Sequence, residues 1–236
     1  EKEYDFAART KTVDEKGGYS PDVWRSFAEL GWTGACLPED MGGYGGSPVE
    51  AMIIMERFGR HLVVEPFVWT VIVGGQLLQA VNNERRTALL EEMVAGEHHV
   101  ALATQERHSR YDLEKIETRA TPGGNGWRID GVKAIVPNGA VADLLFVSAL
   151  TTEGVSLFFV SRDTAGVTVV PFQTQDGHNA AEIRFENVFV DAAALVGEPG
   201  TALDIIDRAM DHGIAALCAE GVGSADYLIK TTTAYL

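Results

Sequence analysis

The chain contains little cysteine and little positive charge. Its two cysteines, Cys36 and Cys218, provide neither a disulfide framework nor the spacing of a metal site. Nineteen Lys and Arg residues stand against 34 Asp and Glu residues, which gives a formal net charge of −15. A protein that binds nucleic acid or an anionic membrane surface needs a basic footprint. The composition therefore argues against both kinds of partner.

Long apolar runs are also missing. The longest, residues 67–78, is interrupted by threonine, glycine and glutamine, whereas a membrane-spanning helix needs about 18 or more apolar residues. No signal peptide is visible, and two unpaired thiols suit a reducing compartment, so we expect a cytoplasmic protein. The sequence starts at Glu1 without a methionine and stops within a helical pattern, so we expect a piece of a longer protein.

Residues 1–96 are expected to form an N-terminal helical domain. Ser20-Pro21 and Ser47-Pro48 each combine an N-cap serine with proline at the first helical position. Glu50 completes a capping box at the second of these sites. Two further helices are predicted, one after Glu65-Pro66 and one over 83–95.

Residues 97–195 change character and predict a central antiparallel β-barrel or sandwich. Short apolar or alternating segments are separated by Gly- and Asn-containing turns, the pattern of an all-β unit. Long helices do not alternate with these strands, which argues against a parallel Rossmann sheet. The expected strands are 100–104, 127–132, 144–148, 156–160, 167–170 and 181–190.

Residues 196–236 predict the first long helix of a C-terminal helical bundle. Apolar residues recur at helical spacing and no capping signal appears before the sequence ends. Such a stripe would be exposed on a lone helix, so we expect further helices, or a neighbouring subunit, to cover it. The expected stripe consists of Leu203, Ile206, Met210, Ile214, Leu217, Gly221, Ala225, Leu228 and Tyr235.

Three features invite a functional interpretation. The glycine-rich segment 42–46 lacks the order of phosphate-binding loops, so a tight turn is favoured over a phosphate site. The six histidines have no metal-like spacing, and no metal is expected. The polar stretch 105–112, Q-E-R-H-S-R-Y-D, follows an apolar strand and is either a solvated loop or a loop that contacts a ligand.

Several short motifs together resemble the acyl-CoA dehydrogenase family, and the resemblance covers nearly the whole chain. Within the family, the chain is most similar to the small subunit of pimeloyl-CoA dehydrogenase-type heteromeric enzymes. That narrower similarity lies in 106–113, 174–177 and 215–220. The family motifs are 38–43 (P-E-D-M-G-G), 131–133 (G-V-K) with 138–139 (N-G), 181–190 (A-E-I-R-F-E-N-V-F-V) and 195–197 (L-V-G).

The resemblance implies a fold and an activity. The fold would be a helical N-terminal domain, a central β-barrel and a C-terminal bundle, with FAD between the barrel and the bundle. The activity would be α,β-dehydrogenation of an acyl-CoA thioester, with an electron-transfer flavoprotein as electron acceptor. The assembly would be a tetramer, either a homo-oligomer or a complex with a homologous large subunit. The catalytic glutamate of the family would lie beyond Leu236.

The resemblance also assigns site residues. Gln105, Tyr111, Pro137 and Asn138 occupy cofactor-facing positions, and Gln105 and Tyr111 are expected on one loop at the mouth of the barrel. Arg107, Arg110 and Asp211 are candidates for substrate binding. Paired N–H donors suit a carboxylate or a CoA phosphate; the alternative is that Arg107 and Arg110 are solvated arginines paired with Glu106 and Asp112.

Several positions depart from the family pattern. Gln105 replaces a threonine, Tyr111 replaces a serine, Ile135 replaces an aromatic residue, and Pro137 replaces a residue whose hydroxyl bonds the flavin. His108 and Arg110 stand at positions that are glycine or small in the family, and Ile214 stands where an arginine contacts CoA. Proline offers no donor, so the resemblance leaves two hypotheses. Either the complete protein is an FAD enzyme with an altered pocket, or it is a catalytically silent scaffold subunit that completes the FAD site of a partner. A binding module without flavin would leave the flanking helices unexplained.

Overall fold

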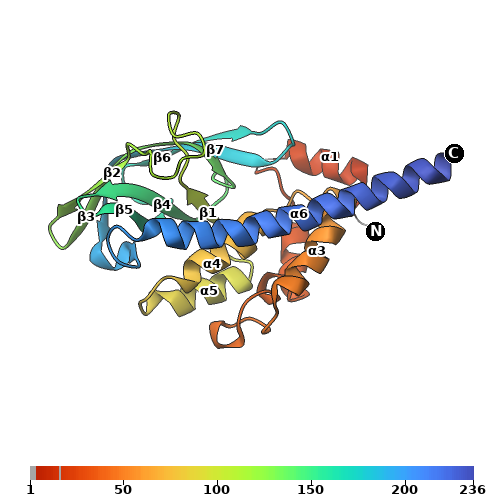
Figure 1. Cartoon of the computed structure of the whole chain (residues 1–236), viewed down its shortest axis with the longest axis horizontal. Helices are drawn as coiled ribbons and strands as arrows, with labels where there is room; N and C mark the ends of the chain where they lie inside the picture. Colours follow the sequence, from red (N-terminus) through yellow and green to blue (C-terminus); the bar gives the residue numbers. More distant parts are fainter. Residues whose placement is uncertain (1–3, 16) are drawn as a thin grey trace.

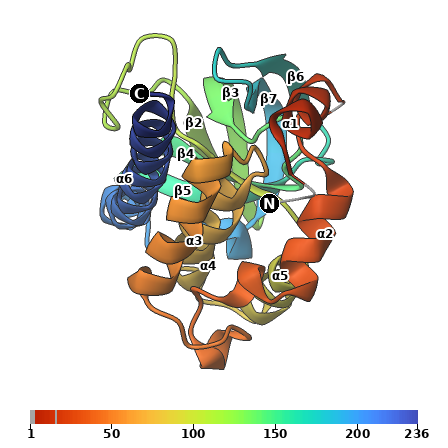
Figure 2. The ribbon, with the colours of Figure 1, turned by 90° about the vertical axis from the view of Figure 1, so that its right-hand side faces the viewer.

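The computed structural model describes residues 4–15 and 17–236 and contains three layers (Figure 1). A twisted sheet forms one side, a group of N-terminal helices forms the other, and the long helix α6 runs along both. The end-on view places α6 to one side of α3, and α1, α2 and α5 to the other (Figure 2). The predicted order of helices, sheet and long helix is therefore confirmed.

The first helices begin where their capping residues predict. Ser20 accepts a hydrogen bond from the backbone N–H of Val23, and Pro21 starts α2. Ser47 and Glu50 form the complete capping box of α3, whose side-chain and backbone bonds satisfy donors that a helix start leaves open. An additional helix, α1, was not predicted. These helices are α1 (Phe6–Asp14), α2 (Pro21–Glu29) and α3 (Pro48–His61).

The apolar segment after Pro66 forms a helix in two parts. A π-helical stretch, Val68–Val73, continues directly into α4 (Gly74–Gln79), and α5 (Arg85–Val94) follows. The segment is almost entirely buried, which explains its apolar composition. Single turns of 3₁₀-helix cover Trp32–Gly34, Glu39–Met41 and Ala192–Ala194. The glycine-rich segment is a compact turn in which Gly42 and Gly45 adopt positive φ angles of 77° and 70°.

The β-region is one eight-stranded sheet with the order β6-β7-β3-β2-β4-β5-β8, to which β1 is added on β4. The sheet is not closed, so the expectation of a barrel was wrong in this respect. Strands β6 and β8 are the two ends of the path. The strands are β1 (Val100–Ala103), β2 (Arg119–Gly123), β3 (Gly126–Pro137), β4 (Leu144–Thr151), β5 (Gly154–Ser161), β6 (Val167–Gln173), β7 (Asn179–Asp191) and β8 (Leu195–Val196).

The sheet is also mixed, whereas an antiparallel sheet was expected. Strand β1 pairs with β4 in parallel over four residues, and β2 joins β4 in parallel through Arg119 and Leu150. The other pairings are antiparallel. Strands β1 and β2 therefore lie one after the other along the same edge of β4, and the segment between them leaves the sheet.

The long helix α6 (Ala202–Tyr235) packs on α3 through small residues. A side chain at Gly59 of α3 would collide with the carbonyl of Glu220, and one at Gly223 would collide with the carbonyl of Glu56. The two helices can therefore approach closely only with glycine at both positions. Within the described residues, no helix is long and apolar enough to cross a membrane.

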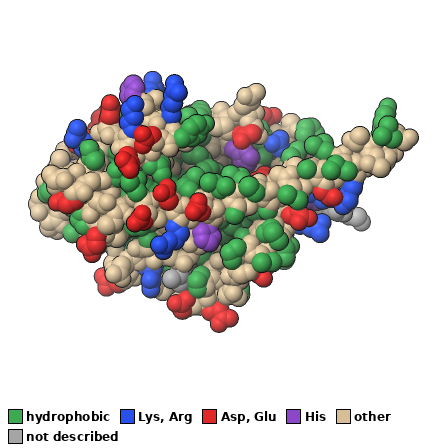
Figure 3. Space-filling view, in the orientation of Figure 1, with side chains coloured by type: hydrophobic (Ala, Val, Ile, Leu, Met, Phe, Trp, Pro, Cys, Tyr) green, Lys and Arg blue, Asp and Glu red, His purple; other side chains and the backbone are tan. Residues whose placement is uncertain are grey.

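The face of α6 that is buried within this chain differs from the predicted stripe, which is expected to be covered by further helices or a neighbouring subunit. Ile206 is fully buried here, whereas Ile214, Leu217 and Leu228 are 53%, 47% and 63% exposed. Figure 3 shows hydrophobic side chains along the surface of this helix. The helical periodicity of the sequence identified the large apolar residues of α6. The close contact with α3, however, buries mainly small residues of α6. The buried residues are Ala202, Ile206, Ala209, Gly213, Ala216, Ala219 and Gly223.

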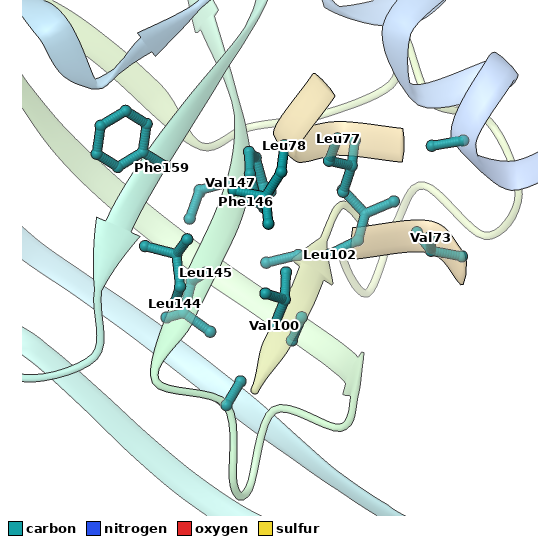
Figure 4. Packing of buried hydrophobic residues seen from close by; sticks show 14 of the residues in the cluster. Val73, Leu77, Leu78, Val100, Leu102, Leu144, Leu145, Phe146, Val147 and Phe159 are labelled. Carbon is teal, nitrogen blue, oxygen red and sulfur yellow. The ribbon is translucent and has the colours of Figure 1, made fainter. Parts of the chain in front are cut away.

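The core is continuous from the helices to the sheet. Leu77 and Leu78 of α4 lie toward Leu102 of β1 and Phe146 of β4, and all four are buried (Figure 4). Close packing of this kind holds α4 and the π-helical stretch firmly against β1. Residues at the edge of that contact are consequently fixed in position, and several of them form the site described next.

Candidate functional site

The polar loop 104–118 lies where the sheet is interrupted between β1 and β2. Glu106 fills this gap, and its carboxylate accepts hydrogen bonds from the backbone N–H groups of Glu117 (2.6 Å) and Thr118 (3.1 Å). These are donors that a neighbouring strand would otherwise satisfy. Ser109 closes the loop on itself, because its hydroxyl accepts from the Glu106 N–H at 2.9 Å. One buried carboxylate therefore anchors both ends of the loop.

Lys133 of β3 pairs with this carboxylate inside the sheet. Its Nζ lies 2.7 Å from Glu106 Oε1, 3.1 Å from Ser148 Oγ and 3.4 Å from the Thr104 carbonyl, so each of its three hydrogens has an acceptor. Lys133 is 0% exposed. Burial lowers the pKa of Lys133 to about 8, although Glu106 opposes the change.

Both the glycine and the lysine of the G-V-K motif serve this arrangement. Gly131 sits at an irregularity of β3 with φ 152°, and a side chain there would collide with Thr118. Burial alone would raise the pKa of the Glu106 carboxyl group. Hydrogen bonds from Lys133 and Thr118 outweigh this effect and lower the pKa of Glu106 below its ordinary value. The motif thus builds a charged pair that holds the loop.

Gln105 and Pro137 both lie near the C-terminal end of β3. Gln105 forms an isolated antiparallel bridge with Ile135, and its carbonyl accepts from the Ala134 N–H at 2.8 Å. Ile135 is 46% exposed beside it. Pro137 ends β3, two residues further on, and borders a cavity.

Asn138 is buried and engaged in structural contacts. Its Nδ2 donates to Thr70 Oγ1 at 3.1 Å and to the Val100 carbonyl at 2.9 Å, and its φ of 62° makes the N-G turn. Through these bonds Asn138 ties the end of β3 to β1 and to the π-helical stretch. The contribution of Asn138 in this geometry is to position Pro137, since its side-chain nitrogen is occupied.

The outer part of the loop points to solvent. Tyr111 is 92% exposed, and Arg110 has a left-handed backbone with φ 52°. Arg107 Nη2 forms an ion pair with Glu182 Oε2 of β7 at 2.7 Å. Arg107, Arg110 and Lys115 border an open hollow at the protein surface. Tyr111 and Gln105 therefore share one loop, and neither of them lines the cavity that Pro137 borders.

That cavity lies between the helical layer, the sheet and α6, and has a volume of about 280 Å³. Its walls are largely apolar, and the rings of Phe58 and Phe67 meet edge to face at 5.2 Å. A mostly apolar hollow with a few polar groups is the usual form of a small-molecule site. The lining includes Met55, Phe58, Phe67, Val68, Pro137 and Leu217, together with the polar residues Glu65, Asp176, His178, Asn179 and Glu220.

Asp211 is on the exposed side of α6, away from the lining of this cavity. The structure therefore brings Gln105, Pro137 and Asn138 to one end of the sheet, places Arg107 and Arg110 at the outer loop, and separates Asp211 from both groups. The roles predicted for these seven residues remain predictions.

Two important residues were missed by sequence reasoning. Lys133 was noticed as part of a motif, but its buried pairing with Glu106 depends on the folded sheet. Glu65 was interpreted as preceding a helix start, although its side chain is 4% exposed and borders the cavity. A glutamate between Val64 and Pro66, within an otherwise apolar segment, is the signal that could have drawn attention to it.

Comparison with known proteins places this geometry in a family. Residues 3–97 match the family model described as the acyl-CoA dehydrogenase N-terminal domain, and residues 101–188 match the acyl-CoA dehydrogenase middle domain. The chain is 27% identical to a probable acyl-CoA dehydrogenase, fadE25, of Mycobacterium bovis, over 99% of this chain and 62% of that protein. It is 28% identical to cyclohex-1-ene-1-carbonyl-CoA dehydrogenase of Geobacter metallireducens, over 94% of this chain and 61% of that protein.

Solved structures show the same fold. Acyl-CoA dehydrogenase from Geobacillus kaustophilus matches with a TM-score of 0.88 and 23% identity, over 99% of this chain and 64% of that one. The ChsE4-ChsE5 complex from Mycobacterium tuberculosis matches with a TM-score of 0.86 and 23% identity, over 97% and 61% of the respective chains. The chain thus spans less than two thirds of the length of these relatives. The matched domains cover most of the sequence, and the chain belongs to the acyl-CoA dehydrogenase family.

Proposed function

We propose that the complete protein takes part in FAD-dependent α,β-dehydrogenation of an acyl-CoA thioester, as one subunit of a heteromeric enzyme. The observation that carries this proposal is the apolar cavity bordered by Pro137 and α6, in a chain of this family. The relative from Geobacter metallireducens is named for a dehydrogenation of an acyl-CoA. The complex of ChsE4 with ChsE5 provides a heteromeric precedent for the fold.

The proposed organisation comprises a helical domain (1–96), a sheet domain (97–195) and the first helix of a bundle (196–236). The glutamate that removes the α-proton would come from the sequence beyond Leu236. Electrons would leave to an electron-transfer flavoprotein. A homologous large subunit would cover the exposed apolar residues of α6, which is a common way for such a surface to be buried.

The end of the sheet offers a partial fit for FAD. Ile135, half exposed beside the amide of Gln105, provides an apolar surface with an adjacent hydrogen-bonding group. A bound flavin would accept the hydride from the acyl chain. Gln105 would hold the cofactor, and Asn138 would keep the end of β3 in place.

The scaffold hypothesis is favoured by a specific observation. Pro137 borders the cavity but has neither an N–H nor a hydroxyl, so it cannot donate to a flavin. Tyr111 is exposed to solvent and does not line the cavity, so its hydroxyl does not replace the donor that Pro137 lacks. In the scaffold hypothesis this chain binds little flavin alone and completes a site on its partner.

A test of the proposal uses the complete protein, produced alone and together with its homologous partner. Flavin absorbance is recorded, followed by anaerobic bleaching with a set of acyl-CoAs. Bleaching in either preparation supports the proposed reaction, and flavin only in the joint preparation identifies a supporting subunit. Absence of flavin and of acyl-CoA binding in both preparations would refute the proposal.

A substitution sharpens this test. Pro137→Thr restores an N–H and a hydroxyl at the end of β3, and we expect it to increase flavin retention. The matched control is Pro171→Thr, a strand proline of β6 that is exposed and does not border the cavity. Equal flavin content in both variants and the parent would show that Pro137 does not limit cofactor binding.

A further inference from the structure

Positive charge gathers on the outer part of the loop 104–118, although the chain as a whole is acidic. Figure 3 shows Lys and Arg side chains beside a histidine at the upper edge of the molecule, where this loop lies. Only 19 lysines and arginines oppose 34 acidic residues in the chain, so several cations around one hollow reverse the sign of charge locally and attract anions. We call this open space of about 520 Å³ the outer hollow, and it is lined by Arg107, His108, Ser109, Arg110, Asp112 and Lys115.

Two cations of the outer hollow have no partner of their own. The side chains of Arg110 and Lys115 form no hydrogen bond or ion pair with any described residue, and neither does His108. Asp112 contributes the one carboxylate among the described lining residues, and its Oδ1 already accepts the Glu114 N–H at 3.0 Å. The donors of Arg110 and Lys115 are therefore available to a ligand from solvent.

Arg107 keeps part of its donor capacity as well. Its Nη2 lies 2.7 Å from Glu182 Oε2, while the other oxygen of Glu182 accepts from Arg184 Nε at 2.9 Å and Nη2 at 2.8 Å. One carboxylate is thus shared by two guanidinium groups, which together retain a positive charge. The contact with Glu182 also fixes the orientation of Arg107 at the rim of the outer hollow.

The turn that carries these cations is held in place from below. Glu106, anchored by Lys133, precedes Arg107, and the buried Ser109 hydroxyl both accepts from the Glu106 N–H at 2.9 Å and donates to its carbonyl at 3.0 Å. Arg110 follows in a left-handed conformation with φ 52°, which is unfavourable for a residue with a side chain. Such a backbone persists where the surrounding contacts enforce it, so the cations are arranged before any ligand arrives.

The outer hollow lies within reach of the cavity that Pro137 borders. Pro137 is two residues from Ile135, which bridges to Gln105, and Arg107 is two residues further along the loop. With strand and loop dimensions for these steps, the Cα atoms of Pro137 and Arg107 are at most about 19 Å apart. The extended arm that joins the thioester to the nucleotide in CoA can span such a distance.

A phosphate monoester matches the outer hollow better than a carboxylate does. It carries close to two negative charges near neutral pH and three terminal oxygens that accept strong hydrogen bonds. Arg107, Arg110 and Lys115 offer one cation for each oxygen, whereas a carboxylate has one charge and two oxygens. Tyr111, 92% exposed and next to Arg110 in the sequence, adds an open ring on which a nucleotide base can stack.

We propose that the outer hollow binds a phosphate monoester, and that its occupant in the proposed reaction is the 3′-phosphate of the CoA nucleotide. Arg110 and Lys115 donate to the phosphate oxygens, and Arg107 completes the rim. The phosphate site rests on the cations of the loop, while CoA as the source of the phosphate rests on the proposed function. These residues determine affinity for the nucleotide and take no part in moving the α-proton or the hydride.

The experiment measures equilibrium binding to the complete protein, with its partner where the partner is required. The ligands are an acyl-CoA, the same compound without its 3′-phosphate, adenosine 3′,5′-bisphosphate and inorganic phosphate. We expect loss of the 3′-phosphate to weaken binding about tenfold, as hydrogen bonds between charged but exposed groups allow. This ratio should fall toward one as the ionic strength rises from about 0.1 M to about 1 M, because salt screens exposed charges. The bisphosphate should bind more tightly than inorganic phosphate and compete with the acyl-CoA.

Variants then assign the preference to the outer hollow. Arg110→Gln and Lys115→Gln should each lower the tenfold ratio to about threefold, and the double variant should abolish it. Arg110→Lys, which keeps the charge, should retain part of the preference. Arg119→Gln is the matched control, because Arg119 is an exposed cation of the neighbouring strand β2 that does not line the outer hollow. It should leave the ratio unchanged.

The outcomes separate this inference from the proposed function. If acyl-CoAs bleach a flavin but bind equally well without the 3′-phosphate, or if Arg119→Gln acts as strongly as Arg110→Gln, the inference is overturned and the proposed function stands. If inorganic phosphate binds as tightly as the bisphosphate, the occupant is free phosphate and the assignment to CoA is overturned. If the bisphosphate binds through Arg110 and Lys115 but no acyl-CoA binds or bleaches a flavin, the phosphate site stands and the proposed function fails. If none of the four ligands binds, both fail.

Discussion

The buried pair of Lys133 and Glu106 gives a prediction whose size can be worked from the structure. Glu106→Gln keeps the shape of the side chain but removes its negative charge. Lys133, 0% exposed and 2.7 Å from Glu106 Oε1, then loses the group that compensates its charge. Removal of one member of a buried ion pair typically costs about 3–5 kcal/mol, and we expect a loss of stability in that range.

The double substitution tests whether the pair is the cause. Lys133→Met in the Glu106→Gln background removes the uncompensated charge and places an unbranched apolar side chain in the sheet. The double variant should therefore be more stable than Glu106→Gln alone by about 1–3 kcal/mol, the usual coupling between groups in contact. Glu182→Gln is the control, because its two partners, Arg107 and Arg184, are 72% and 51% exposed and such pairs contribute at most about 1 kcal/mol each.

Stability is measured by urea unfolding of the complete protein at several pH values. Because folding lowers the pKa of Lys133 from 10.5 to about 8, the unfolded chain binds more protons between these values. This group therefore adds stability as the pH rises from 8 to 10.5, and Lys133→Met should remove that gain. Because folding also lowers the pKa of Glu106, its contribution is lost as the pH falls below about 4.5. If the loss of stability in the double variant equals the sum of the losses in Glu106→Gln and Lys133→Met, the pair is not the cause and the prediction is refuted.

Three further predictions concern the helices and the segment that packs on them. Burial lowers the pKa of His99 to about 4, so the folded protein should lose up to about 3 kcal/mol of stability as the pH falls from 6.5 to 4. His99→Phe should reduce this loss in the free energy of unfolding. Gly223→Ala should destabilise the protein by about 1–3 kcal/mol, because the new methyl group would collide with α3. Gly221→Ala should stabilise the protein by about 0.5–1 kcal/mol, because the space around Gly221 is open and alanine favours a helix. Thermal unfolding measures both changes. Ser47→Ala should cost about 1 kcal/mol in urea unfolding, and no change would exclude a contribution from the capping box.

The sequence predicts those parts of the fold that local chemistry determines. The caps at Ser20 and Ser47 predict the starts of α2 and α3, because the donors of a first helical turn need nearby acceptors. Asn138 predicts the turn after β3, because asparagine tolerates the left-handed backbone found there. The family motif G-V-K also has a local physical role, because Gly131 leaves room for Thr118 and Lys133 pairs with Glu106.

Pairings between distant segments were harder to predict. Strand β2 contains Pro122 and exposed side chains, so its pattern resembles a loop, and its pairing with β4 depends on a single contact at Leu150. The parallel direction of β1 on β4 joins segments about 40 residues apart. Local alternation identifies a strand but contains no information about the direction of its neighbour. The sheet was consequently predicted as closed and antiparallel, and it is open and mixed.

The candidate site divides in the same way. Gln105 and Pro137 were selected by resemblance at single positions, and the bridge between Gln105 and Ile135 brings that group together. Glu65 could not be selected in this manner, since its burial depends on α3, α6 and the end of the sheet all meeting around it. A polar residue in an apolar segment is ordinary when it is exposed. It becomes informative only when the fold closes around it, and for this reason the structure is needed to recognise Glu65 as a buried carboxyl group beside the cavity and not only as a residue that precedes a helix.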